Sequence, residues 1–399
     1  MMVPARTLQP PPTDLKKLLL IAVLLPLLAA MGWWYFYERE LPSLAPAYRE
    51  YAYVSNSKSN TVSVIDVRTF EPAKTIKVGS EPTSLAANSK KNEVYVANVS
   101  SSTVSVIDAE RNEVAATIAV RGKPVSIEIS GDGRHAYVAA SNPGNVFVLD
   151  LDSRSEVGNI RVGDDPAGVQ ISKDGRTVAV SNRGDNTVSL IDAKKLTVRA
   201  TVPVCKQPKS VTILPDSSKA FVACMGSAQV ASIDLKNDKL LALLDVGEAP
   251  SDIVAKPDGG EVVVCNSGSN SISMIESATD EVSGSYLIGN RPSRGIVTED
   301  SSRFMVSNSG SNSVAVYDID FGKIIALLPV GSHPDGLALS QSQNYLMVLN
   351  SESGDITVIQ KRKARKLEPT EYSLLTMIPV GMHPANIVVK SFMLGAPPK

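Results

Sequence analysis

Three cysteines and three histidines are the side chains of this 399-residue sequence best suited to bind a metal or act as nucleophiles. Cys205, Cys224 and Cys265 are widely spaced. His333 and His383 also stand far apart, so no CxxC, CxxCH or HExxH pattern for zinc or covalent haem is present. The sequence therefore predicts no metal and no cofactor, and any chemistry must come from side chains that the fold brings together.

The composition is that of a folded chain with balanced charge. The 40 Lys and Arg residues against 41 Asp and Glu residues give no reason to expect a nucleic-acid partner. A hydrophobic content of 43% is too high for a disordered chain. Short alternating runs of Val, Ser, Asn and Gly are typical of β-strands.

Residues 18–37 contain no charge and, as a helix, would span roughly 30 Å, the thickness of a bilayer core. Lys16 and Lys17 precede this segment and Glu38 follows it, so the positive-inside rule places the N-terminus in the cytoplasm. We expect a single-pass anchor in the cytoplasmic membrane, with the rest of the chain on the periplasmic or extracellular side. The alternatives are a cleaved signal peptide with a poor cleavage site at residues 30–32, or a buried helix of a soluble domain.

A 42-residue period runs through the rest of the chain. Seven prolines stand 42 residues apart and an eighth follows after 50, while a mostly acidic series and an asparagine series share the period. The prolines are Pro82, Pro124, Pro166, Pro208, Pro250, Pro292, Pro334 and Pro384; the acidic series is Asp66, Asp108, Asp150, Asp192, Asp234, Glu276 and Asp318; the asparagines are Asn56, Asn98, Asn182, Asn266, Asn308 and Asn350. We interpret the Asn and Asp residues as turn formers that accept left-handed backbone angles and cap their own turns.

Each repeat reads as four strands, A to D. After Pro166, strand patterns cover residues 167–172, 177–181, 187–191 and 197–204, with turns between them. Four strands in about 42 residues make a β-propeller blade.

Counting strands predicts an all-β propeller of eight blades. Seven complete sets lie between Pro82 and Pro384, strands B to D remain in residues 51–78, and one strand A remains in residues 385–390. Three strands and one strand complete an eighth blade that closes the ring. The predicted organisation is a cytoplasmic segment (1–17), a transmembrane anchor (18–37), a linker (38–50), the propeller (51–392) and a tail (393–399).

The motifs Tyr-Val-Ser-Asn at residues 53–56, Tyr-Val-Ala-Asn at 95–98, Thr-Val-Ser-Val-Ile-Asp at 61–66 and Val-Gly-Ser-Glu-Pro at 78–82 carry a resemblance. They resemble the YVTN-type β-propeller repeat of prokaryotic surface and periplasmic proteins. The resemblance implies a binding or scaffold module without general enzymatic activity, and it carries over no catalytic residue. Many members are described as seven-bladed, so seven blades is the alternative to eight.

Departures from the repeat indicate candidate sites. The D–A and B–C loops form one face of such a ring, and Cys205, Cys224, Cys265, His333 and His383 all fall on it. The cysteines are buried apolar side chains, or two of them form a disulfide, or they hold a metal. The histidines are loop residues or, alternatively, ligands.

Four polar residues on innermost strands also depart from the Ser, Gly, Ala or Val of most blades. These are Arg294, Asp252, Glu128 and Gln170. They either form a polar site for a small ligand near the channel mouth or pair with one another or with channel water.

The last full blade carries an insertion of eight residues rich in bases. Lys361, Arg362, Lys363, Arg365 and Lys366 are expected in a C–D loop on the opposite face. This loop is a candidate contact for the membrane or an acidic partner, or else a solvated charged loop.

Two function classes fit these observations. The first is a membrane-anchored extracytoplasmic propeller that acts as a binding or scaffold module for a protein, a surface polymer or a small ligand. The alternative is a propeller enzyme or cofactor-handling protein, such as a lactonase-like hydrolase or a relative of the haem d propeller proteins.

Overall fold

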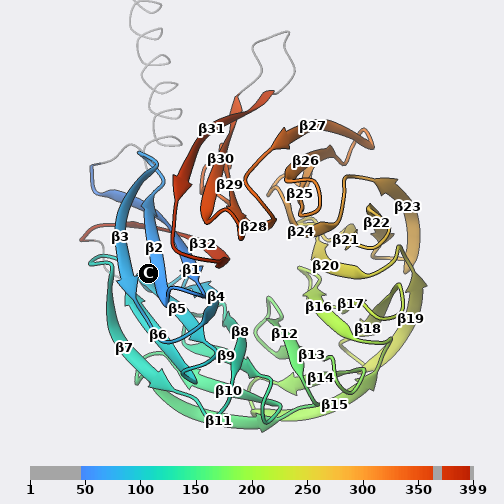
Figure 1. The fold of residues 1–399 in the computed structure, drawn as a ribbon. Coiled ribbons are helices and arrows are strands. Elements are labelled where there is room, and N and C mark those ends of the chain that lie inside the picture. The colour runs from blue at the N-terminus through green and yellow to red at the C-terminus, as the bar shows by residue number, and fades with distance from the viewer. Residues whose placement is uncertain (1–45, 363–370, 396–399) are drawn as a thin grey trace, which may run out of the picture. The chain divides into compact units, whose positions relative to one another are not determined.

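The computed structural model describes residues 46–362 and 371–395, and over these ranges the chain is built from β-strands (Figure 1). Within these ranges, no helix has the length and apolar character needed to cross a membrane. The predicted anchor (18–37) lies outside the described residues. From Arg49 onwards the chain forms one compact unit.

The described strands form eight antiparallel sheets of four, which we number as blades 1 to 8. Blade 1 contains β4 (Pro82–Ala87), β5 (Glu93–Asn98), β6 (Thr103–Asp108) and β7 (Glu113–Ala119); blade 2 contains β8 (Pro124–Ile129), β9 (His135–Ala140), β10 (Asn145–Asp150) and β11 (Ser155–Arg161); blade 3 contains β12 (Pro166–Ile171), β13 (Thr177–Asn182), β14 (Thr187–Asp192) and β15 (Thr197–Pro203); blade 4 contains β16 (Pro208–Ile213), β17 (Lys219–Cys224), β18 (Gln229–Asp234) and β19 (Lys239–Asp245). Blade 5 contains β20 (Pro250–Ala255), β21 (Glu261–Asn266), β22 (Ser271–Glu276) and β23 (Glu281–Leu287); blade 6 contains β24 (Pro292–Val297), β25 (Arg303–Asn308), β26 (Ser313–Asp318) and β27 (Lys323–Pro329); blade 7 contains β28 (Pro334–Leu339), β29 (Tyr345–Asn350), β30 (Asp355–Arg362) and β31 (Glu371–Pro379); blade 8 contains β32 (Pro384–Met393), β1 (Tyr48–Asn56), β2 (Thr61–Asp66) and β3 (Glu71–Lys77).

Blade 8 closes the ring with strands from both ends of the chain. Its order is β3-β2-β1-β32, so the C-terminal strand is the innermost one (Figure 1). The prediction of eight blades with three-plus-one closure is confirmed, and the seven-bladed alternative is wrong. Both closing strands are longer than predicted: β1 begins at Tyr48, and β32 runs on to Met393, where the ring of Phe392 lies 6.2 Å from that of Tyr51 in β1.

The aspartates of the acidic series cap their turns as predicted, whereas the asparagine series has a different role. Asp108 Oδ1 accepts hydrogen bonds from the amides of Glu110 and Arg111 in the next turn. Asn98 is fully buried, and its side-chain amide donates to the hydroxyls of Thr103 and Ser105.

The predicted left-handed angles fall instead on the last turn residue before strand C, such as Asn60, Asn186 and Asn270. The buried amide also explains the Val-Gly motif, since a Cβ at Gly79 would lie 2.7 Å from Asn98 Cγ.

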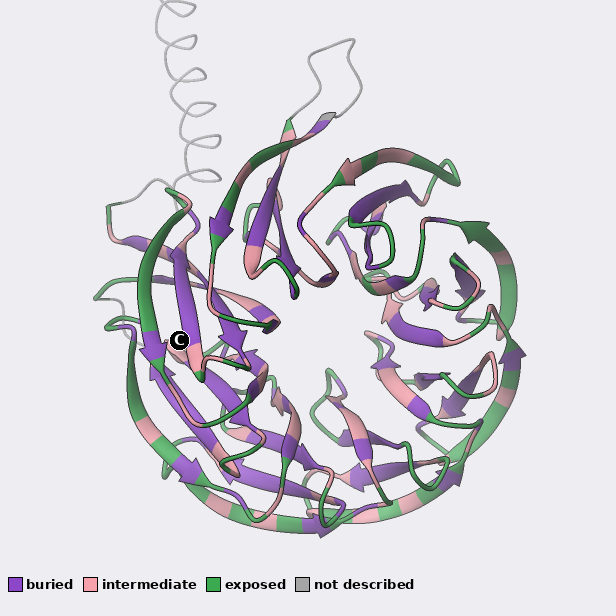
Figure 2. Cartoon of the chain, viewed as in Figure 1, coloured by how far each residue is buried: buried purple, intermediate pink, exposed green. Residues whose placement is uncertain are grey.

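The core lies between neighbouring blades. Strands B and C are buried on both faces, whereas the outermost strand D of each blade is mostly exposed or half-buried and carries at most one buried residue in most blades (Figure 2). The largest fully buried side chains include Tyr53, Tyr95, Phe147, Phe221 and Phe304, which sit on strands B or C of separate blades. Each blade is therefore stabilised by the next, and the ring has no blade that can pack alone.

The basic insertion is only partly a loop. Lys361 and Arg362 are the last residues of β30 and pair with Tyr372 and Glu371 of β31, so the prediction that they lie in a loop is wrong. β30 and β31 are longer than the equivalent strands of the other blades, because two further residue pairs continue their antiparallel ladder. Lys363, Arg365 and Lys366 lie outside the described residues.

Candidate functional site

The structure joins two of the three cysteines. Cys205, in the loop between β15 and β16, forms a disulfide with Cys224 at the end of β17, and their Cα atoms are 5.6 Å apart, a usual span. Cys265 is a buried thiol in the core between blades 5 and 6, and burial raises its pKa. The three cysteines therefore do not share one site.

His333 and His383 occupy the same position in two successive D–A loops. Each precedes a repeat proline at a positive φ (56° and 52°). The Nδ1 of His333 lies 3.1 Å from the Ser351 hydroxyl, and that of His383 lies 3.3 Å from the Ser57 hydroxyl. Across residues 46–362 and 371–395, no group of three or more His, Cys, Asp or Glu side chains is placed to hold a metal ion.

The innermost strands bring Arg294 and Asp252 together. Arg294 Nη1 donates to Asp252 Oδ1 at 3.3 Å, and this carboxylate raises the pKa of Arg294. The same carboxylate accepts bonds from the Ser210 hydroxyl at 3.0 Å and the Gly295 amide at 3.1 Å. Asp252 is only 6% exposed, so its carboxylate is enclosed and paired with these three donors.

Gln170 and Glu128 lie deeper on their strands and are not part of this pair. Gln170 Oε1 accepts the amide of Ile213 at 2.7 Å and so ties blade 3 to blade 4. Glu128 has no hydrogen-bond partner among the described residues, and burial raises its pKa to about 7. A carboxyl in this setting favours its protonated form.

This carboxyl should make the stability of the propeller depend on pH. Because the folded-state pKa of Glu128 is raised from 4.5 to about 7, its protonated form is favoured by folding, and stability falls as the pH rises through this range. Relative to Glu128→Gln, the wild type should lose about 2 to 3 kcal/mol of unfolding free energy between pH 4.5 and pH 8. Urea unfolding of both proteins at pH 4.5, 6 and 8 measures this, and parallel pH profiles would contradict it.

Sequence reasoning missed Lys209, which shares the channel mouth with Arg294. Lys209 follows Pro208 on β16, at a position where no other blade has a cation. Burial and the nearby charge of Arg294 lower its pKa. The sequence signal that could have identified Lys209 is a charged residue on an innermost strand where most blades have a small or apolar one, which is also how Arg294 was identified.

The first residues of the innermost strands line a cavity of about 270 Å³. Because these strands begin at the D–A loops, the cavity lies at the channel mouth on the face that carries the disulfide and both histidines. Its lining comes from blades 1, 2, 3, 4, 6 and 8 and includes Lys209, Arg294 and small residues such as Ser84 and Ser126.

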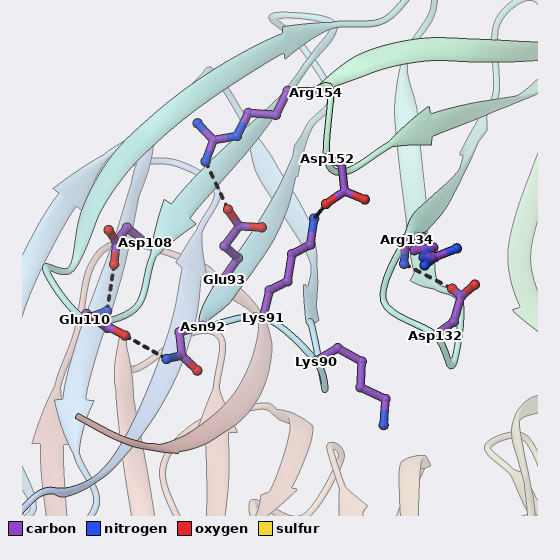
Figure 3. Close-up of a pocket in the computed structure, with 10 residues that line it drawn as sticks. All are labelled: Lys90, Lys91, Asn92, Glu93, Asp108, Glu110, Asp132, Arg134, Asp152 and Arg154. Carbon is purple, nitrogen blue, oxygen red and sulfur yellow. Dashed lines mark hydrogen bonds and ion pairs between the residues drawn. The ribbon is translucent and has the colours of Figure 1, made fainter. Parts of the chain in front are cut away.

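A second hollow, of about 650 Å³, lies on the opposite face between blades 1 and 2 (Figure 3). Its charges mostly neutralise each other across the two blades. Lys91 Nζ contacts Asp152 at 2.7 Å, and Arg154 Nη2 contacts Glu93 at 3.0 Å (Figure 3). These pairs give the hollow a structural role in joining the blades.

Exposed apolar side chains are concentrated on the outer strands of blades 4 to 7. Eleven of the eighteen exposed large apolar residues in the described chain lie on β19, β23, β27 and β31, which we call the apolar rim. The outer strands of the other four blades carry only two, Val114 and Val157. Sequence reasoning also missed this feature.

The closed ring of four-stranded blades defines the chain as a β-propeller. Residues 43–174 match the family described as YNCE-like beta-propeller, which is consistent with the YVTN-type repeat seen in the sequence. Comparison with curated proteins gives no match.

Several solved propeller structures share the fold. Hydrazine synthase of Kuenenia stuttgartiensis is 22% identical with a TM-score of 0.59, over 70% of this chain and 95% of that chain. A functionally unknown protein from Desulfotomaculum acetoxidans is 19% identical with a TM-score of 0.58, over 71% and 99%. The dihydro-heme d1 dehydrogenase NirN in complex with DHE is 16% identical with a TM-score of 0.70, over 85% and 74%. At these identities the likeness concerns the fold alone.

Proposed function

We propose that this chain is a binding or scaffold propeller, held to the membrane outside the cytoplasm, whose apolar rim binds a protein partner. The apolar rim is the observation that carries the proposal. Large exposed apolar patches on soluble surfaces mark interaction sites, since leaving them in water is unfavourable.

The repeat itself provides an internal comparison. One exposed position on the outer strand holds Thr75, Thr117, Asn159 and Thr201 in blades 8, 1, 2 and 3. In blades 4 to 7 the same position holds Leu243, Ser285, Leu327 and Met377, three of them large and apolar. The polar residues of the other four blades show that the propeller fold does not require an apolar residue at this position. Binding of a partner explains why blades 4, 6 and 7 carry one.

The curvature of the rim favours a polypeptide as its occupant. Four consecutive blades make up half of the ring, so the rim bends through about half a turn. A flat bilayer or the convex edge of a second copy touches only a short arc of such a surface. Each outer strand is also the last in its sheet, so one edge can pair with an extended apolar segment of a partner.

Two features support the placement outside the cytoplasm. The Cys205–Cys224 disulfide is typical of an oxidising compartment. The uncharged residues 18–37 and their flanking charges support a single-pass anchor, and the bases from Lys361 to Lys366 are a candidate contact for anionic headgroups or an acidic partner.

Cross-linking in cells, followed by purification of the tagged full chain, tests the proposal. The rim variant carries Leu243→Asn, Leu327→Asn and Met377→Asn, and Asn159 shows that Asn fits this position. We expect it to recover at least about tenfold less of the partner that the wild type recovers, because each apolar side chain contributes about 1 to 2 kcal/mol when buried.

The matched control places the same residue on the polar half of the ring. Thr75→Asn, Thr117→Asn and Thr201→Asn change side chains that are also exposed, at equivalent positions, and should leave recovery unchanged. Equal recovery by the rim variant and the wild type, or an equal loss in the control, would refute a partner on the rim.

A further inference from the structure

We propose that the mouth of the channel binds a small oxyanion through Lys209 and Arg294. This inference goes beyond the proposed function, because it concerns a small ligand inside the channel and not a protein on the rim. It rests on the cavity, on the charges that line it and on the donors that remain available there.

The cavity has the size and lining of a site for a small polar ligand. Its volume of about 270 Å³ is below the usual range for drug-sized ligands. A phosphate, a sulfate or a short dicarboxylate fits this volume better than a nucleotide. The lining includes two cations, Lys209 and Arg294, together with the polar residues Thr83, Ser126 and Asn386, and it contains no carboxylate.

Donors of both cations remain available in the cavity. Arg294 contacts Asp252 through Nη1 alone, which leaves its Nε and Nη2 groups without a partner in the described chain. Its side chain is 48% exposed and lines the cavity. Lys209 Nζ has no hydrogen-bond or ion-pair partner among the described residues.

The negative charges near these cations lie outside the lining. Asp252 is enclosed and already accepts bonds from Ser210, Gly295 and Arg294. Asp335, the residue after Pro334, attracts Lys209 and Arg294 at longer range but does not line the cavity.

The hydroxyl of Thr83 is buried at the same site without a partner. Guanidinium, ammonium and hydroxyl donors around a small cavity are the groups that bind carboxylate and phosphate oxygens.

Calorimetric titration of the full chain in detergent, with inorganic phosphate and with succinate at constant ionic strength, tests this inference. We expect saturable binding of one molecule per chain for at least one of the two anions. Phosphate alone would identify the ligand as a phosphoryl compound, and succinate alone would identify it as a carboxylate. Lys209→Gln should weaken binding by about tenfold or more, because it removes a charge-assisted hydrogen bond.

Lys206→Gln is the matched control. Lys206 is an exposed cation on the same face, three residues away but outside the cavity, and its replacement should leave the affinity unchanged. Lys209→Gln should fold normally, since its Nζ makes no bond in the described chain, and the melting temperature checks this. No saturable binding by the wild type, or equal losses in both variants, would overturn the inference. Such a failure would leave the rim proposal standing, because the cross-linking experiment uses neither residue.

Discussion

Removal of residues 384–399 should abolish cooperative folding of the whole propeller. This deletion takes away β32, the innermost strand of blade 8, and exposes the edge of β1. It also removes Ile387 and Phe392, which are 7% and 8% exposed and pack in the cores on either side of blade 8. Losses of about 2 to 5 kcal/mol for each buried side chain approach the total stability of about 5 to 15 kcal/mol of a typical domain. Thermal unfolding followed by circular dichroism should show no sharp transition.

A matched pair of phenylalanines makes this prediction quantitative without removing a strand. Phe392→Ala should lower the unfolding free energy by about 3 kcal/mol, because the ring is buried against β1. Phe321→Ala, at a side chain that is 75% exposed in the turn before β27, should cost less than about 1 kcal/mol. Similar effects of the two substitutions, or a cooperative transition in the truncated chain, would show that β32 does not close the ring.

The ring itself could be predicted from the sequence because each 42-residue repeat corresponds to one set of four strands. The prolines from Pro82 to Pro334 begin the innermost strands at a constant spacing, and the acidic series ends the third strands. Counting the strands left over at each end then fixes both the number of blades and the closure. These quantities depend on chain order alone.

The contents of the site depend on distances across the ring, which the repeat does not encode. The sequence placed Cys205, Cys224 and Cys265 on one face, but the disulfide depends on how the loop before β16 approaches the end of β17. The asparagine series shows the same limit. Asn98 reads as a turn residue, yet its side chain is buried and bonds to hydroxyls of the next strand.

The apolar rim could not be recognised from the sequence for a different reason. The outer strand β27, with the sequence Lys-Ile-Ile-Ala-Leu-Leu-Pro, has the pattern of a strand packed on both faces. Its place at the edge of the ring leaves Ile324 and Leu327 exposed at 42% and 60%. Only comparison with β3 or β15 at the same position, once burial is known, shows that these side chains are unusual.

The disulfide should contribute about 3 kcal/mol to the stability of the propeller. The sequence separation of Cys205 and Cys224 is 19 residues. A cross-link over a loop of this length lowers the conformational entropy of the unfolded chain and so raises its free energy by about 3 kcal/mol. Both side chains are buried in the core between blades 3 and 4, so their loss is also felt in packing. Urea unfolding with and without reductant, for the wild type and for Cys205→Ala/Cys224→Ala, should show the wild type stabilised only when oxidised.

Cys265→Ala is the matched control, because Cys265 is equally buried but unpaired. The response of this variant to reductant should equal that of the wild type, since the Cys205–Cys224 bond is intact in it. The same bond also reports the compartment. Disulfides persist outside the cytoplasm. If the propeller folds there, an alkylating reagent that traps thiols in intact cells and is kept present during denaturation should label only Cys265. Labelling of all three cysteines would mean that the chain is kept reduced, and it would count against both the disulfide and the proposed location.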